Sequence, residues 1–208
     1  MSATRGQGAC VTTTSANPPA TGGAAEAWVR RLDEATSLDG IVAPIRTRVA
    51  EVVGQGRARE VLGGAWLGHA AHPMLTDVPI GCWTSANVLD LIGGRASRPA
   101  AQRLVGLGVL SAIPTVLTGA SDWSVSTDPR VQRVGLVHAA GNKTATVAYL
   151  LSWLARRRGR HVSGVAWALL GTTVATGAGY LGGHLSYSLG SRAGETVPLE
   201  APPPLPPA

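Results

Sequence analysis

Four long apolar stretches constrain what this chain can fold into. They run over Met74–Ile92, Leu104–Ala120, Val134–Ala155 and Val162–Leu185. An α-helix needs ~20 residues to cross a hydrocarbon layer, and roughly 17 to 25 apolar residues are typical of membrane-spanning helices. The last stretch has no charged residue between Val162 and Gly183, which disfavours a buried helix of a soluble protein. The pattern therefore predicts an all-α fold, an integral membrane four-helix bundle.

The residues on either side of these stretches have different patterns. Residues 1–24 are rich in small and polar residues and residues 191–208 are rich in proline, so both are predicted to be disordered tails. Residues 26–63 place apolar residues at helical spacing with charged residues between them. This segment is predicted to be amphipathic and helical, lying on a membrane surface or packing on the bundle. Residues 64–190 then form the four-span domain.

Charged residues are few and lie mainly at the ends of the apolar stretches. The net charge is +6, yet the arginines cluster in RASRPAAQR and ARRRGRH rather than along one polar helix face with interleaved aromatic residues. We therefore expect the lipid bilayer, and not nucleic acid, as the partner of this chain. By the positive-inside rule these two clusters are cytoplasmic, which predicts a multi-pass protein of the cell membrane with the opposite face outside the cytoplasm. Arginines at 46–59 argue for the reverse orientation.

Four of the five histidines are predicted to converge on one membrane face. In a chain that crosses four times, the first stretch starts, the second ends, the third starts and the fourth ends on the same side. The metal-ligating candidates at these positions are His69, His72, Asp77, Asp122, His138 and His184.

Several kinds of chemistry fit this arrangement, and no spacing motif distinguishes them. A zinc or copper ion would use three of the histidines, with or without Asp77 or Asp122. A haem would use two histidines from facing helices, whereas a proton or quinone site would use His138 and a carboxylate. The same residue types are also common at the membrane–water boundary without any ligand. The cofactor-binding candidates are His72, His138 and His184.

Lys143 is predicted to lie near the centre of the bilayer. It is ~14 Å into the third stretch at 1.5 Å per residue, where a lysine costs roughly 2.5 to 3.5 kcal/mol. We expect it to face the bundle or pair with an acid, in a polar seam with Asn142, Asp77 and Asn87. A proton-coupled transporter using Lys143 and Asp77 is a further hypothesis, but the sequence has no visible internal repeat, which disfavours it.

Several strings resemble a known family, namely HAAHPMLTDVPIGCW, DWSVST, LVHAAGN and GYLGGHLSYSLG. They resemble the bacterial four-helix membrane proteins known as domain of unknown function 2231, over approximately Leu38–Gly190. The resemblance implies a redox-associated membrane module, because some members continue into a Rieske iron-sulfur domain. A Rieske centre needs two Cys and two His ligands, and neither follows His184 here. A Rieske-type or other redox protein is therefore an expected separate partner.

Two functional hypotheses follow. The first is a redox-associated membrane module that binds haem or a transition metal through His72, His138 and His184, with Asp77 and Asp122 as relay groups. The second is a non-catalytic membrane anchor or scaffold for a soluble partner, with close helix packing or homo-oligomer formation through a stripe of small residues in the fourth stretch. Neither hypothesis makes the chain an enzyme, because no nucleophile elbow, phosphate loop or carboxylate pair stands in a suitable context.

Overall fold

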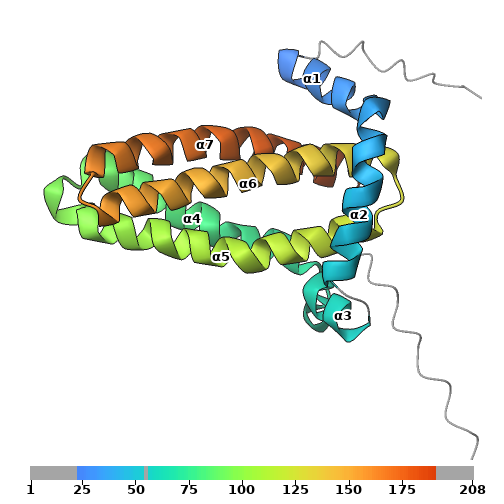
Figure 1. Ribbon diagram of the computed structural model, residues 1–208, viewed down its shortest axis with the longest axis horizontal. Coiled ribbons are helices and arrows are strands. Elements are labelled where there is room, and N and C mark those ends of the chain that lie inside the picture. Colours follow the sequence, from blue (N-terminus) through green and yellow to red (C-terminus); the bar gives the residue numbers. More distant parts are fainter. Residues whose placement is uncertain (1–22, 54–55, 191–208) are drawn as a thin grey trace, which may run out of the picture.

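The computed structural model describes residues 23–53 and 56–190, and the elements assigned within these ranges are all helices. Apart from residues 23 and 24, the two predicted tails lie outside the described residues. The four apolar stretches form four long helices that lie side by side (Figure 1). They are α4 (Ala71–Ile92), α5 (Arg98–Val125), α6 (Pro129–Arg157) and α7 (His161–Gly183). The prediction of an all-α fold is confirmed.

Short connections make successive long helices antiparallel. Residues 126–128 join α5 to α6 and residues 158–160 join α6 to α7. The Asp128 carboxylate accepts a hydrogen bond from the Arg130 backbone N–H at 2.8 Å and caps the start of α6, where Pro129 takes a first-turn position. Gly159, with φ of 73°, provides the left-handed turn that follows α6. As a result α4 and α6 run in one direction and α5 and α7 in the other.

Two of the long helices are long and apolar enough to cross a membrane by themselves. These candidate spans cover Arg95–Val125, which includes the 3-10 helix Arg95–Ser97, and His161–Ser188, which includes the π-helix His184–Ser188. The other two helices carry charges along their length, including Asp77 and Asp90 in α4 and Lys143 in α6. Composition and length in the described residues therefore support two of the four predicted spans, and the four-helix membrane bundle is not confirmed.

The pair α4 and α5 repeats in the pair α6 and α7. Asp90 in α4 contacts Arg156 in α6, 66 residues later, and Trp83 stacks on Tyr149 at the same separation, with ring centroids 4.1 Å apart. Residues of α4 and α6 separated in this way therefore lie at the same level of the bundle. The second helices repeat too, because Gly108 in α5 lies against the Trp83 ring as Gly171 in α7 lies against the Tyr149 ring.

This internal repeat corrects the sequence analysis, which found none. Few equivalent residues are identical, and Asp90 and Arg156 carry opposite charges, so the repeat is mainly one of packing positions. Because α4 and α6 run in the same direction and meet across the core through Trp83 and Tyr149, we describe the two helical hairpins as related by an approximate two-fold axis along the bundle. The aromatic stack lies near this axis and forms the main core with small residues of neighbouring helices, including Ala86, Ala112 and Ala168.

Residues 26–63 divide into several helices that pack across one end of the bundle (Figure 1). They form α1 (Ala24–Asp33), a 3-10 helix (Thr36–Leu38), α2 (Asp39–Val53) and α3 (Arg57–Gly63), and a second 3-10 helix (Ala65–Leu67) leads to α4. Val29 of α1 is buried against Val134 of α6 and Leu181 of α7. The sequence analysis left open whether this segment lies on a membrane surface or packs on the bundle. In the structure α1 and α2 pack on the long helices.

Candidate functional site

His72 and His138 occupy equivalent positions in the two hairpins. His72, in the first turn of α4, has its Nδ1 3.0 Å from the carbonyl oxygen of Thr115 in α5. Its ring lies against Gly119, where a Cβ would come within 2.6 Å of the ring Cε1. His138 of α6 repeats this arrangement, with its Nδ1 2.8 Å from the carbonyl oxygen of Ala178 in α7. Each imidazole is thus fixed by a backbone carbonyl of its hairpin partner.

These two hydrogen bonds set the protonation of each ring. A carbonyl oxygen only accepts, so Nδ1 of both His72 and His138 carries the proton and Nε2 keeps its lone pair. A histidine that binds a metal through one ring nitrogen commonly donates its other N–H to a backbone carbonyl. Asn142 donates to both Nε2 and the carbonyl oxygen of His138, each at 3.1 Å.

The other two histidines at this end are held separately. His184 has its Nε2 3.2 Å from Oδ1 of Asp33 in α1, and His69 precedes α4 with its Nδ1 3.3 Å from the Ala70 carbonyl oxygen. Across residues 23–53 and 56–190, no three His, Cys, Asp or Glu side chains are grouped so that they could hold a metal ion. The four histidines predicted to converge therefore do not form one cluster. His72 and His138 are equivalent residues of the two hairpins, whereas His69 and His184 have other hydrogen-bond partners.

The two predicted carboxylates also lie in different environments. Asp77 is exposed on α4. Asp122, near the end of α5, has its Oδ2 buried without a hydrogen-bond partner among the described residues. Asp122 is one turn beyond Thr118, whose hydroxyl lies 3.5 Å from His72 Nδ1. A buried carboxylate oxygen is costly unless a cation or a donor satisfies it, so Asp122 is the more informative of the two.

The predicted seam of Lys143, Asn142, Asp77 and Asn87 is not formed. Lys143 is exposed, because five residues turn a helix by about 500° and place it roughly 140° around α6 from His138. Asn142 follows His138 by four residues and stays on the inner face. Asn87 instead donates a hydrogen bond to the Thr172 hydroxyl at 2.8 Å and makes no contact with Lys143.

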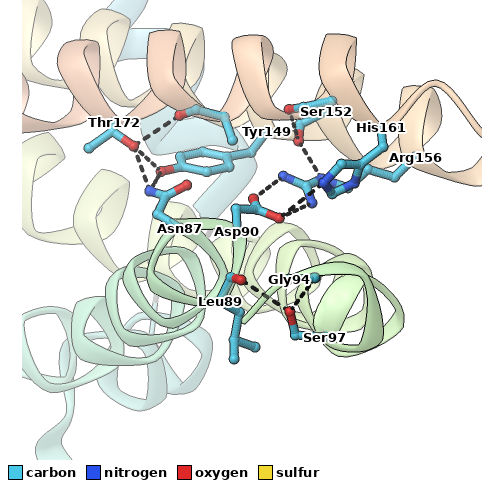
Figure 2. A network of polar contacts seen from close by, with 12 residues as sticks. Asn87, Leu89, Asp90, Gly94, Ser97, Tyr149, Ser152, Arg156, His161 and Thr172 are labelled. Carbon is cyan, nitrogen blue, oxygen red and sulfur yellow. Dashed lines mark hydrogen bonds and ion pairs between the residues drawn. The ribbon is translucent and has the colours of Figure 1, made fainter. Parts of the chain in front are cut away.

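A buried ion pair that the sequence analysis missed lies near the connection from α6 to α7, at the other end of the bundle, and Figure 2 shows its contacts. Arg156 of α6 donates from Nη1 and Nη2 to the two oxygens of Asp90 in α4, at 2.8 and 2.5 Å. The side chains are only 2% and 5% exposed, respectively. Arg156 Nε also donates to the Ser152 hydroxyl at 3.1 Å, and that hydroxyl donates to the Gly164 carbonyl at 2.6 Å. His161 Nε2 lies 3.8 Å from Asp90 Oδ1.

Next to this ion pair along the bundle lies the Trp83–Tyr149 aromatic stack, and polar side chains form hydrogen bonds with its tyrosine. The Tyr149 hydroxyl lies 2.8 Å from that of Thr172, and Asn87 donates to both of them (Figure 2). The sequence analysis treated Arg156 as a positive flank of a membrane span and gave Asp90 no role. The signal that could have identified the pair is their separation, which equals that of His72 and His138.

A second polar cluster fixes α1 and α2 to the histidine end. Arg133 donates from Nε and Nη2 to the Asp39 carboxylate at 2.6 and 2.7 Å, and from Nη1 to the Asp33 carbonyl at 2.8 Å. These hydrogen bonds hold the pKa of Asp39 below its ordinary value. Arg46 of α2 also donates to the Ser126 carbonyl at 3.1 Å. The N-terminal helices thus cover the end of the bundle that carries the histidine pair.

Comparison with known proteins gives one match. The family model described as "Predicted membrane protein (DUF2231)" matches residues 68–195. This range begins just before His69 and includes all four long helices. No curated protein and no solved structure matches the chain.

Proposed function

The chain belongs to the DUF2231 family of predicted membrane proteins, and we propose that it is a redox-associated membrane module that holds a haem between His72 and His138. The observation that carries this proposal is that the two imidazole rings make the same hydrogen bond and have the same protonation. Each donates its Nδ1–H to a backbone carbonyl, at 3.0 and 2.8 Å, so the Nε2 lone pair is the one that would bind iron. On His138 this lone pair accepts a hydrogen bond from Asn142 at 3.1 Å, which a bound iron would replace. Their equivalent places on α4 and α6 put them at one level, on either side of the bundle axis.

The number of ligands favours haem over a zinc or copper ion. A tetrahedral metal ion takes three or four ligands from the protein, and such a group is absent from the described part of the chain. A haem iron needs only the two axial positions filled by side chains, since the porphyrin supplies the other four nitrogens. His184 and His69, which have other partners, are therefore not required.

The residues around the pair suit such a group. Gly119 and Gly182 lie against the His72 and His138 rings and let the neighbouring helices approach them closely. The buried, unpartnered Oδ2 of Asp122 lies near the same end, and this carboxylate would offset the single positive charge of the iron–porphyrin core of a ferric haem. When bound, the haem would supply reversible one-electron transfer, while the chain's residues hold and orient it.

We further propose that all four long helices cross the membrane. Both candidate spans, α5 and α7, run in the same direction. If both cross, α6 has to return through the bilayer between them, because its connections to them are short. The charges that lower the hydropathy of α4 and α6 include Asp90 and Arg156, which are buried against each other. This arrangement accommodates them away from lipid.

From the arginine-rich connections we infer that the ion-pair end lies in the cytoplasm and the histidine end outside it. A redox partner such as a Rieske-type protein would then meet the module at the histidine end, near α1 and α2. A cysteine-reactive, membrane-impermeant label on intact cells tests this orientation. In a chain whose native Cys10 and Cys82 are replaced by alanine, a cysteine introduced at Ser126 should react and one at Arg158 should not, and the reverse result would overturn the orientation.

Visible absorbance of the full-length protein tests the haem proposal. Protein purified in mild detergent from haem-supplied cells should show a Soret band with about one haem per chain. His72→Ala and His138→Ala should each lose the band, whereas His184→Ala should keep it because His184 is bound to Asp33. A wild-type preparation without haem would overturn the proposal and favour the anchor or scaffold. Loss of the band in His184→Ala alone would overturn the choice of ligands.

A further inference from the structure

Asp77 and Lys143 are equivalent residues of the internal repeat. Asp77 follows His72 by five residues in α4, and Lys143 follows His138 by five residues in α6. Both are exposed, and neither forms an ion pair within the described residues. The approximate two-fold axis places them on opposite outer faces of the bundle at the same level. One face thus presents an acid and the other a base.

Both charges lie level with the most apolar part of the bundle. The Leu75 carbonyl accepts a hydrogen bond from the Thr115 hydroxyl at 3.1 Å. Asp77, two residues further along α4, is therefore level with the middle of the uncharged stretch Leu104–Ser121 of α5. Lys143 lies in the middle of α6, ~21 Å from either end at 1.5 Å per residue. Neither side chain is placed to reach a lipid headgroup in a bilayer that α5 spans.

An exposed charge at this depth requires a partner. A lysine or an aspartate at the bilayer centre costs roughly 2.5 to 3.5 kcal/mol on insertion scales, and such residues usually pair with each other or face protein. Within one chain the two charges cannot meet, because the bundle separates them. Two copies inserted in the same orientation do bring them together, since Asp77 of one copy and Lys143 of the next lie at the same depth.

We propose that a second copy of this chain docks the outer face of its α6 on the outer face of α4, and that Asp77 and Lys143 form an ion pair between the copies within the membrane. This inference rests on the proposed four-crossing arrangement and is independent of the haem.

The two faces also complement each other in side-chain size. One turn beyond Asp77, α4 exposes Gly81, and the equivalent position of α6 exposes Val147, which is 47% exposed. Small residues on one helix let a second helix approach closely in lipid, where packing and polar contacts drive association. The faces are unlike and lie on opposite sides of the bundle, so the contact is head-to-tail. Successive copies therefore form a row or a large ring rather than a two-fold dimer.

Two charge-removing variants test the proposal when they are mixed. Asp77→Asn keeps the base and Lys143→Met keeps the acid, so neither variant can form the ion pair with itself. A mixture of the two can form it once, between an Asp77 of one variant and a Lys143 of the other. The oligomer size is measured in liposomes by single-molecule photobleaching of labelled full-length chains. Glu60→Gln removes an exposed acid outside the four long helices and is the matched control.

A membrane-soluble carbodiimide provides a direct readout of the contact, because it couples a carboxylate to a neighbouring amine and Lys143 is the only lysine in the sequence. We expect wild type and Glu60→Gln to form a ladder of cross-linked oligomers with an Asp77–Lys143 peptide. Each charge variant alone should lose that ladder, and the mixture should recover dimers without larger species. The Soret band should be unchanged in every variant, which separates this test from that of the haem. Monomeric wild type, or single variants that assemble as wild type does, would overturn the proposal.

Discussion

Removal of one partner from the buried Asp90–Arg156 ion pair is expected to destabilise the fold strongly. The guanidinium contacts both carboxylate oxygens at 2.8 and 2.5 Å, and the side chains are 5% and 2% exposed. Asp90→Leu or Arg156→Met leaves the other charge buried without its counterion, which costs about 3 to 5 kcal/mol. Arg156→Met also leaves Ser152 without its donor, but that hydroxyl still donates to the Gly164 carbonyl at 2.6 Å, so the added loss is about 1 kcal/mol or less.

The double variant separates the energy of the pair from the energy of an unpaired charge. Asp90→Leu with Arg156→Met replaces both charges by apolar groups, and buried pairs replaced in this way are often neutral or more stable by about 1 to 4 kcal/mol. The double variant should therefore be more stable than either single variant. Arg157→Met is the matched control, because the exposed Arg157 lies 4.9 Å from the Trp153 ring centroid and its loss costs about 0.5 to 1 kcal/mol.

The assay is reversible unfolding in mixed micelles with a denaturing detergent, followed by circular dichroism and tryptophan fluorescence. The measured quantity is the free energy of unfolding of each variant relative to wild type. The reasoning would be refuted if the two single losses were additive in the double variant, or if each single loss were no larger than that of Arg157→Met.

Three further predictions concern the histidine pair, the N-terminal helices and the core. Gly119→Ala places a Cβ 2.6 Å from the His72 ring, and Gly182→Ala places one 3.0 Å from the His138 ring. Gly177→Ala is the control, because its Cβ meets open space. The haem content, measured by absorbance, should fall most for Gly119→Ala and stay unchanged for Gly177→Ala. Because hydrogen bonds from Arg133 lower the pKa of Asp39, its contribution to stability is present above the unfolded pKa of about 3.9 and is lost as the pH falls through the folded value. The stability difference between wild type and Asp39→Asn should therefore shrink below about pH 4, and a difference that grew on acidification would contradict this account. Trp83→Ala removes a buried ring stacked on Tyr149 and should lower the free energy of unfolding by about 3 to 5 kcal/mol, measured in the same micelle assay; a loss below about 1 kcal/mol would mean that the stack does not hold the two hairpins together.

The local pattern of the sequence was sufficient for the long helices. Apolar runs, a proline after the capping Asp128 and a glycine in the connection after α6 are short-range signals, and each corresponds to a helix or a helix boundary in the structure. The same periodicity places His138 and Asn142 on one face, and these residues do contact each other. Local signals of this kind depend on neighbours within about one turn and are readable without knowledge of the fold.

What the sequence did not provide was the pairing of residues on different helices. The sequence analysis grouped four histidines by the side of the membrane on which they lie. The side of the membrane does not determine how each helix is rotated about its own axis. In the structure this rotation directs His184 toward Asp33 and leaves Lys143 on an outer face. The repeat was missed because most of its equivalent residues are not identical, His72 and His138 being an exception, and the contacts between helices reveal it.

The sequence alone therefore determined that this chain is helical, apolar and a member of a membrane-protein family, because composition and period are local properties. The tertiary structure decided which polar groups meet. It paired Asp90 with Arg156 and set His72 and His138 in equivalent positions, because the meeting of two side chains depends on the register and rotation of whole helices, which are fixed only when the helices pack together.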